Sequence, residues 1–399
     1  MCKQRLVLCR YNSYLLMFDD RDKINSKQET MDFKNIGLIA PLLKAIDGLG
    51  HTAPTDIQKQ SIPYILEGKN IIGCAQTGTG KTGAFAIPLL HLLATEQHSG
   101  KKPRALIVVP TRELAVQIDQ SFAGYGKYLH IEHMVIYGGV SQAKQVSRLQ
   151  KGVDILVATP GRLLDLMNQG HVDLSAVRRL ILDEADNMLD MGFVNDIKKI
   201  LKRMPAQKQT LLFSATMPKA IRKFAGEILD QPVEVTVSPI SSTSEKVSQS
   251  VFFINKNQKT KRLTKMLLDE KNIQTLIFMR TKHGADRLAK SLGRSGVQTA
   301  CIHGNKSQNA RENALLSFKN GKINVLIATD IASRGIDIKE LPQVINYDLP
   351  ADSETYVHRI GRTGRAGNEG KAVSFCSEDE RPMLAKIQKL IGFQVPIAQ

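Results

Sequence analysis

A glycine-rich segment, placed between an apolar run and a helical pattern, carries the first residues that could do chemistry. It reads Ala75-Gln76-Thr77-Gly78-Thr79-Gly80-Lys81-Thr82. Glycines let the backbone curl so that its N–H groups converge on phosphate oxygens, and the following helix N-terminus adds partial positive charge. Lys81 would reach the outer phosphates and Thr82 would ligate Mg²⁺. The alternative is a plain strand-to-helix turn, since Ala75 stands where the strict pattern has glycine.

An acidic segment follows a second apolar run. Leu180-Ile181-Leu182 leads into Asp183-Glu184-Ala185-Asp186. The carboxyl ends of parallel strands form the crevice in which α/β proteins bind ligands. Asp183 is therefore placed to hold Mg²⁺ through its waters, and Glu184 to orient or deprotonate an attacking water. Alone, this segment would fit a helix N-terminus stabilised by its dipole; beside a phosphate loop it indicates nucleotide hydrolysis.

Short apolar runs alternate with helix-length segments such as 82–93 and 112–128. This alternation predicts βαβ units around buried parallel sheets. The predicted strands are 70–74, 105–109, 133–137, 155–158, 180–182, 210–213, 233–237, 251–254, 275–279, 299–302, 324–328, 343–346 and 372–376.

The predicted organisation is two α/β domains with a hinge near residue 240. Residues 238–246 are rich in Ser and Pro and show no periodicity, which is typical of a linker. We expect a first domain over 31–237 and a second over 247–399. Residues 1–30 are interpreted as an extension outside the core, because polar residues interrupt any signal-peptide pattern.

Composition narrows the class of protein. The 399 residues are 42% hydrophobic and 23% charged, which excludes a mostly disordered chain, and no apolar run is long enough for a membrane helix. The net charge of +17 favours a polyanionic partner. The five cysteines have no C-x-x-C spacing, which favours a reducing compartment and predicts a cytoplasmic protein.

The ordered motifs resemble those of the DEAD-box RNA helicases, a family named after the tetrapeptide at 183–186. The resemblance covers residues 33 to about 376, and segment 187–193 is similar to the bacterial RhlE-type branch. It implies two tandem RecA-like domains joined by a short linker, with ATP and Mg²⁺ as cofactors. The matching segments are Phe33, 54–58, 75–82, 110–115, 138–139, 159–162, 183–186, 214–216, 277–278, 308 with 311, 328–330, 334–337 and 358–365.

The resemblance assigns roles around ATP. Gln58 and Thr55 would read the adenine edge, with Phe33 stacking on the base, since an amide offers both a donor and an acceptor. Asp337 matches the ribose contact. Arg362 and Arg365 match cationic fingers that the second domain supplies to the transferring phosphoryl group. The residues that match the coupling elements are Asp186, Ser214, Thr216 and His358.

The resemblance also implies clamps for RNA phosphates and sugars, which position a strand without reading its sequence. The residues concerned are Pro110, Thr111, Arg112, Gly138, Gly139, Thr159, Pro160, Gly161, Arg162, Gly304, Gln308, Arg311 and Thr329.

The implied activity is ATP-dependent local unwinding of short RNA duplexes, coupled to closure of the two domains. Two alternatives stay open: an ATP-gated RNA clamp with little unwinding, and a DNA-directed helicase. Ribosome-assembly or RNA-decay proteins are the expected partners, and a monomer is the default.

Overall fold

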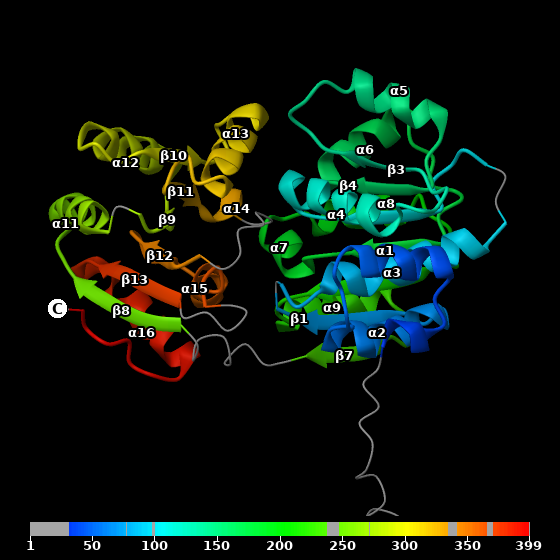
Figure 1. The fold of residues 1–399 in the computed structure, drawn as a ribbon, viewed down its shortest axis with the longest axis horizontal. Helices are drawn as coiled ribbons and strands as arrows, with labels where there is room; N and C mark the ends of the chain where they lie inside the picture. The colour runs from blue at the N-terminus through cyan, green and yellow to red at the C-terminus, as the bar shows by residue number, and fades with distance from the viewer. Residues whose placement is uncertain are drawn as a thin grey trace, which may run out of the picture.

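The computed structural model contains two α/β lobes that lie side by side (Figure 1). It describes residues 32–76, 78–97, 100–237, 247–270, 272–333, 341–364 and 370–398. The predicted extension 1–30 and linker 238–246 lie outside the described residues. Every strand pairing within the two sheets is parallel, which confirms the predicted fold class.

The first lobe is a seven-stranded sheet with helices on both faces and strand order β3-β4-β2-β5-β6-β1-β7. Its elements are the 3₁₀ helix η1 (Phe33–Ile36), α1 (Ala40–Gly48), α2 (Asp56–Leu66), β1 (Ile71–Ala75), α3 (Lys81–Thr95), β2 (Ala105–Val108), α4 (Arg112–Tyr125), β3 (His133–Ile136), α5 (Ala143–Lys151), β4 (Ile155–Ala158), α6 (Pro160–Asn168), β5 (Arg179–Leu182), α7 (Ala185–Asp190), α8 (Val194–Leu201), β6 (Gln209–Ser214), α9 (Lys219–Ile228) and β7 (Val233–Val237).

The second lobe is a six-stranded sheet with strand order β10-β11-β9-β12-β13-β8. Its elements are β8 (Val247–Phe253), α11 (Lys256–Asp269), β9 (Thr275–Met279), α12 (Lys282–Arg294), β10 (Thr299–Ile302), α13 (Gln308–Lys319), β11 (Val325–Thr329), α14 (Asp330–Ser333), β12 (Gln343–Asn346), α15 (Ser353–Ile360), β13 (Gly370–Cys376), the 3₁₀ helix η2 (Glu378–Glu380) and α16 (Arg381–Ile391).

Alternating side chains build a core on each face of each sheet. Along β2, Ala105 and Ile107 belong to the cluster on one face, and Leu106 and Val108 belong to the cluster on the other. Successive side chains of a strand point to opposite faces of the sheet. Because both faces are buried here, consecutive residues of β2 are apolar. The register aligns the strand ends, because Cys74 of β1 lies opposite Ser214 of β6. Loops that follow these strands therefore meet at one edge.

All thirteen predicted strands are present, with bounds that differ by a few residues. The largest strand difference is at β8, which begins four residues before the predicted start. Helix α4 ends at Tyr125, three residues before the predicted end, where Gly126 forms the C-cap. Glycine is a poor helix former, which favours the end of the helix at this point.

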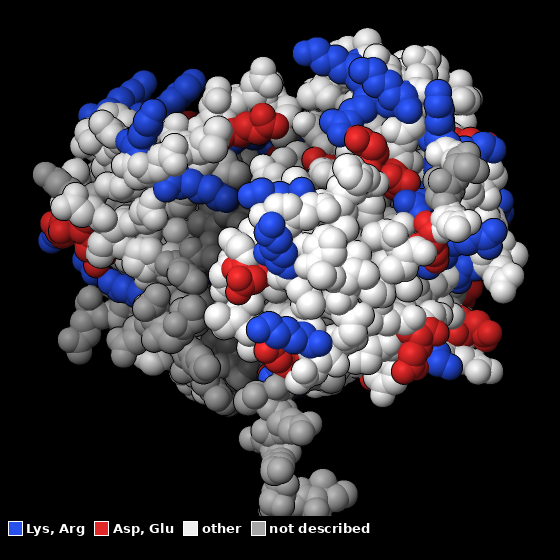
Figure 2. Space-filling model, turned by 45° about the vertical axis from the view of Figure 1, so that its right-hand side comes forward, with Lys and Arg blue, Asp and Glu red and all other residues white. Residues whose placement is uncertain are grey.

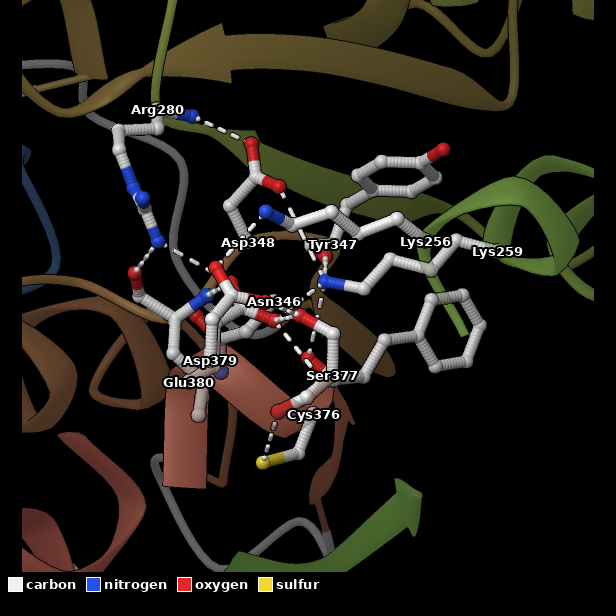
Figure 3. A network of polar contacts seen from close by, with 12 residues as sticks. Lys256, Lys259, Arg280, Asn346, Tyr347, Asp348, Cys376, Ser377, Asp379 and Glu380 are labelled. Atoms are coloured by element: carbon white, nitrogen blue, oxygen red, sulfur yellow. Dashed lines mark hydrogen bonds and ion pairs between the residues drawn. The ribbon is translucent and has the colours of Figure 1, made fainter. Parts of the chain in front are cut away.

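A buried ion pair joins three elements of the second lobe (Figure 3). Nζ of Lys259 in α11 donates to Oε2 of Glu380 at 2.6 Å and to the carbonyl of Tyr347 at 2.8 Å. Both side chains are only 2% exposed. Glu380 also accepts from Arg280 and from the backbone N–H of Ser377. Burial raises the pKa of Glu380, but the Lys259 ammonium and the Ser377 donors outweigh it and hold the pKa below its usual value.

Lys259→Met is expected to destabilise the second lobe by about 3–5 kcal/mol, because it leaves a buried carboxylate short of its main partner. Urea denaturation followed by circular dichroism measures the effect. Lys256→Met is the matched control: this neighbouring lysine pairs with Asp379 at 2.8 Å, but both side chains are more than half exposed. The control should change stability little, and equal effects of the two variants would contradict the assigned role of Lys259.

Surface charge is distributed rather than concentrated. On the face that Figure 2 shows, Lys and Arg side chains form several separate groups, with Asp and Glu among them. Across the described ranges, no helix combines the length and apolar character that crossing a bilayer requires.

Candidate active site

The phosphate loop joins β1 to α3 in the predicted strand-turn-helix setting. Gly78 and Gly80 have φ values of 91° and 94°, which glycine adopts without strain. A Cβ on Gly80 would lie 2.7 Å from both Gln58 Nε2 and Thr55 Oγ1, so glycine is required there. Nζ of the buried Lys81 donates to the carbonyl of Ala75 at 2.7 Å, which spans the base of the loop. The loop therefore has the curled backbone and the cation of a phosphate cradle.

Thr55 and Gln58 form a capping box at the start of α2. Oε1 of Gln58 accepts from the backbone N–H of Thr55 at 3.0 Å, and Nε2 donates to the carbonyl of Gly80 at 3.0 Å. The same amide thus orients the helix start and holds the phosphate loop. Its predicted role as the adenine reader stays a prediction.

Asp183 and Glu184 follow β5 and are buried, with 2% and 6% exposed. Glu184 has a φ of 57° and a ψ of 51°, the left-handed region that non-glycine residues rarely adopt. Its carboxylate accepts from Nδ2 of Asn187 at 2.9 Å, which fixes its orientation. Strained backbone of this kind persists where the surroundings impose it, and it is common at active sites.

Burial shifts the acidity of both carboxyl groups. It raises the pKa of Asp183 to about 7, although the Lys81 ammonium acts in the opposite direction. Burial likewise raises the pKa of Glu184, again opposed by Lys81. A carboxyl group whose pKa is raised accepts a proton more readily than an ordinary carboxylate.

Asp183→Asn is expected to stabilise the fold relative to the wild type more at pH 8 than at pH 5. The gain in unfolding free energy should be about 2 kcal/mol larger at pH 8. Because the folded-state pKa of Asp183 lies above the unfolded value, the native state binds the extra proton at low pH, and stability is lost as pH rises through about 7. The difference in unfolding free energy between variant and wild type, measured by urea denaturation at both pH values, checks this. A difference that does not vary with pH would contradict the burial of an ionised Asp183.

Asp186 connects the acidic segment to β6. Oδ2 accepts from the backbone N–H groups of Ala215 and Thr216 at 3.0 and 2.9 Å and from Oγ1 of Thr216 at 3.1 Å, while Oγ of Ser214 accepts from the Asp186 N–H. Burial raises the pKa of Asp186, but the charges of His358 and Lys81 and the backbone donors outweigh it and keep the pKa low. The four residues predicted to couple the two sites, Asp186, Ser214, Thr216 and His358, thus lie together.

A cavity of about 550 Å³ lies over the phosphate loop and receives residues from both lobes. Arg362 of the second lobe lines it, and the Arg362 charge acts on Glu184. Phe33 lies instead in the first-lobe core with 3% exposed, away from the cavity lining. Among the predicted residues, Thr55, Gln58, Gly78, Gly80, Lys81, Thr82, Asp183, Glu184 and Arg362 line the cavity.

Other predicted nucleotide residues are placed differently. Ala75 ends β1, and Oγ1 of Thr79 donates to the carbonyl of Gln76 within the loop. Thr77, Asp337 and Arg365 lie outside the described residues.

A second cavity, of about 450 Å³, lies between the lobes. Its lining includes residues predicted to contact RNA. Some of them follow the carboxyl ends of β2 and β4, and others belong to the second lobe. Burial, and then the neighbouring guanidinium of Arg311, lowers the pKa of Arg112, while the carboxylate of Glu113 acts in the opposite direction. The predicted residues that line the cavity are Pro110, Thr111, Arg112, Gly138, Thr159, Gly161, Arg162, Gly304 and Arg311.

The other four predicted RNA residues lie at the borders of the elements that carry this cavity. Gly139 leaves room for Arg112, whose NH1 would lie 2.3 Å from a Cβ there. Gln308 begins α13, Pro160 begins α6 and Thr329 ends β11.

Glu113 falls within the predicted RNA-clamp motif 110–113, but no role of its own was predicted for it from the sequence. Its Oε1 forms an ion pair with NH2 of Arg311 at 3.0 Å and accepts from Nε2 of Gln308 at 3.4 Å. The carboxylate belongs to the first lobe and both partners to the second, so this contact holds the lobes together. Its burial, with 8% exposed, is the signal that a sequence alone does not show.

Arg359 positions the helix that carries His358 and leads to Arg362. It is 2% exposed and pairs with Asp330 at 2.6 and 2.8 Å. It also donates to Oδ1 of Asn346 and lies 4.9 Å from the ring centre of Phe278. Helix α15 is therefore fixed to β9, α14 and β12, and it faces α7 across the lobes (Figure 1).

Family models match both lobes. The model described as DEAD/DEAH box helicase matches residues 55–224, and the one described as helicase conserved C-terminal domain matches residues 258–367. This chain belongs to the DEAD/DEAH box helicase family. The resemblance inferred from the motifs is therefore confirmed at the level of the family.

Curated DEAD-box relatives are similar over nearly the whole chain. An ATP-dependent RNA helicase DeaD of Mycobacterium tuberculosis is 44% identical over 90% of this chain and 63% of its own length. An ATP-dependent RNA helicase DbpA of Bacillus subtilis is 40% identical over 91% of this chain and 75% of its own length. The chain spans 60% of the length of the DeaD protein of Buchnera aphidicola that it matches.

A solved DEAD-box structure shares the arrangement of both lobes. Saccharomyces cerevisiae Dbp5, bound to RNA and ADP BeF3, aligns with a TM-score of 0.82 at 32% identity, covering 92% of this chain and 95% of that one. This likeness confirms the two tandem RecA-like domains, because it extends over both sheets in their relative placement.

Proposed function

We propose that the chain is an ATP-dependent RNA helicase in which RNA-stimulated ATP hydrolysis accompanies closure of two domains, 31–237 and 247–399, joined by 238–246. One observation carries the proposal. Arg362 of the second lobe lies in the cavity that also holds the phosphate loop and Glu184 of the first. Hydrolysis then depends on how the lobes are placed, and whatever draws them together controls the rate.

In the proposed mechanism the loop 75–82 holds the phosphates through its N–H groups and Lys81. The curled backbone at Gly78 and Gly80 and the buried Asp183 fit Mg–ATP, with Thr82 and Asp183 as ligands of Mg²⁺ directly or through water. Bound Mg²⁺ would neutralise charge on the phosphates. Glu184, held by Asn187, takes the proton of the attacking water, and Arg362 stabilises the charge that develops on the phosphoryl group.

RNA is proposed to occupy the second cavity, in contact with both lobes. Arginine side chains and backbone N–H groups around it suit phosphate oxygens, so binding should depend steeply on salt and little on sequence. A strand held across both lobes favours closure, and closure favours ATP, so each ligand should strengthen the binding of the other. Dbp5 is described as bound to RNA in the structure that this chain resembles, which supports RNA as the ligand.

Glu113→Gln is expected to raise the RNA concentration for half-maximal ATPase stimulation about tenfold or more. The variant leaves Arg311 without its carboxylate, and removing one partner of a buried charge pair between two bodies costs about 2–5 kcal/mol. Titration of the ATPase rate with single-stranded RNA measures this.

Glu312→Gln is the matched control for this prediction. Glu312 accepts from Gln308 at 2.9 Å as Glu113 does, but within the second lobe. The control should shift the half-maximal RNA concentration less than twofold. Equal shifts would show that the contact between the lobes does not contribute to closure.

Finer aspects of the proposal rest on fewer residues. The segment 187–193 favours the RhlE-type branch, whereas the relatives named above are DeaD and DbpA proteins. A cytoplasmic location is supported by the free thiols of Cys74, Cys301 and Cys376. We propose a monomer that acts on single-stranded RNA and short duplexes, with ribosome-assembly or RNA-decay proteins as partners.

Steady-state ATP hydrolysis with single-stranded RNA, with single-stranded DNA and without nucleic acid tests the proposal. Strong stimulation by RNA alone is expected. Equal stimulation by DNA would support a DNA-directed helicase. No stimulation by RNA, with ATP still bound, would overturn RNA-coupled hydrolysis and favour an ATP-gated clamp.

A further inference from the structure

Three potential metal donors gather at the edge of the second sheet, outside the lining of both cavities described above. Cys301 lies in the edge strand β10, and His303 follows two residues later, so their side chains belong to the same face. Helix α12 covers this face and contributes Asp286. A sulfur, a ring nitrogen and a carboxylate oxygen from these residues all lie within 4.8 Å of one another.

The cluster contains a buried imidazole that lacks a hydrogen bond. His303 is 1% exposed, and neither ring nitrogen has a hydrogen-bond partner among the described residues. Nε2 lies 3.1 Å from Oδ1 of Asp286, which is an ion pair only if the ring is protonated; in a neutral ring with its proton on Nδ1, the Nε2 lone pair would face the carboxylate oxygen. Burying a polar nitrogen without a partner is unfavourable. A bound cation would satisfy its lone pair.

The donor set fits one metal ion better than others. Thiolate, imidazole and carboxylate together suit Zn²⁺, whose bonds of about 2.0–2.3 Å place tetrahedral donors roughly 3.3–3.8 Å apart. Sγ of Cys301 lies 3.3 Å from Oδ1 of Asp286, within this range. A cavity of about 670 Å³, lined by Asp286, Cys301 and Lys306, gives access from solvent.

We propose that Asp286, Cys301 and His303 form a three-ligand Zn²⁺ site, with water as the fourth ligand. Nζ of Lys306 lies 2.9 Å from Oδ1 of Asp286, and its ammonium pairs with the carboxylate in place of a metal ion. Binding of Zn²⁺ releases the thiol proton to solvent and moves the Lys306 ammonium away from Asp286. The ion would tie the end of β10 to α12, directly before Gly304, which lines the proposed RNA cavity.

Titration of the full chain with Co²⁺ as the probe, followed by competition with Zn²⁺, tests the proposal. The wild type is expected to bind one Co²⁺ with a sulfur-to-cobalt charge-transfer band, and Zn²⁺ should abolish the band. Cys301→Ser should remove the band and lower Zn²⁺ affinity more than about 100-fold, since even residues that only support a ligand are worth about 10–100-fold. The matched control is Cys74→Ser, which changes a half-buried thiol outside the cluster and should keep the band.

Lys306→Met separates a metal site from a purely structural cluster. It removes the competing ammonium, so Zn²⁺ affinity should rise about fivefold, as expected for the loss of one partly exposed ion pair. A cluster held together by Lys306 would instead be weakened by this change, with no gain in affinity. A wild type without the band, or a Cys301→Ser variant that retains it, would overturn the proposal.

Discussion

Glu184→Gln is expected to bind ATP and RNA normally but to hydrolyse ATP about 100- to 10,000-fold more slowly than the wild type. The amide has the shape of the carboxylate and still accepts from Asn187, whose Nδ2 lies 2.9 Å from Oε2 of Glu184. It cannot take a proton from water. The cavity therefore keeps its shape while the chemical step loses its base.

Single-turnover hydrolysis and fluorescent-nucleotide binding measure the two quantities separately. The exposed Glu132, which pairs only loosely with Arg148 at 3.9 Å, provides the control Glu132→Gln. Its rate should equal that of the wild type. A normal rate in Glu184→Gln would remove Glu184 from the mechanism, and a parallel loss of ATP binding would show that the residue shapes the cavity instead.

Arg362→Ala is expected to lower the RNA-stimulated rate of hydrolysis about 1,000-fold or more, since a cationic finger supplied by a second body is worth about 10³–10⁵ in rate. Arg362 is 9% exposed and lines the phosphate-loop cavity from the opposite lobe. The slow rate without RNA should change much less, because it does not require closure. The ratio of stimulated to basal turnover is the measured quantity.

Two further variants test this prediction: Arg362→Lys keeps the charge at the same position, and Arg381→Ala removes an arginine elsewhere. Lysine keeps the charge but not the planar fork of donors, so it should recover only part of the stimulation. Arg381 opens α16, and its guanidinium carbon lies 5.4 Å from the ring centre of Phe253. It does not line the cavity over the phosphate loop, so its removal should leave the stimulation by RNA intact. Stimulation by RNA that survives in Arg362→Ala would place the catalytic cation elsewhere.

Local signals made much of the first lobe predictable. The segment 75–82 needs only its own glycines, its lysine and the flanking strand and helix, and the structure has all of these. Asp183 could be placed because a parallel strand must end at the ligand-binding edge. The inner strands of both sheets were predictable for a similar reason: each is a short run of mainly apolar residues, and most of its residues are buried. The edge strands β7 and β8 instead include exposed residues.

What could not be predicted depends on contacts between distant segments. In the sequence, Glu113 is an ordinary acidic residue at the start of a helix. Only in the folded chain does Gln308, 195 residues away, contact its carboxylate. The left-handed backbone of Glu184 is imposed by its surroundings and has no local sequence signal. The resemblance predicted that Phe33 stacks on the adenine, but in the folded chain its ring packs in the apolar cluster of the first lobe.

The buried guanidinium of Arg359 has a mechanical consequence. It ties α15 to helix α14 through Asp330 and to two strands through Asn346 and Phe278, so a shift of α15 against the second sheet would break these contacts. The second lobe thus reaches the first at two acidic residues, since His358 acts on Asp186 and Arg362 acts on Glu184. If the second lobe moves as one body on closure, we expect the contact at Asp186 and the contact at Glu184 to form together rather than one after the other.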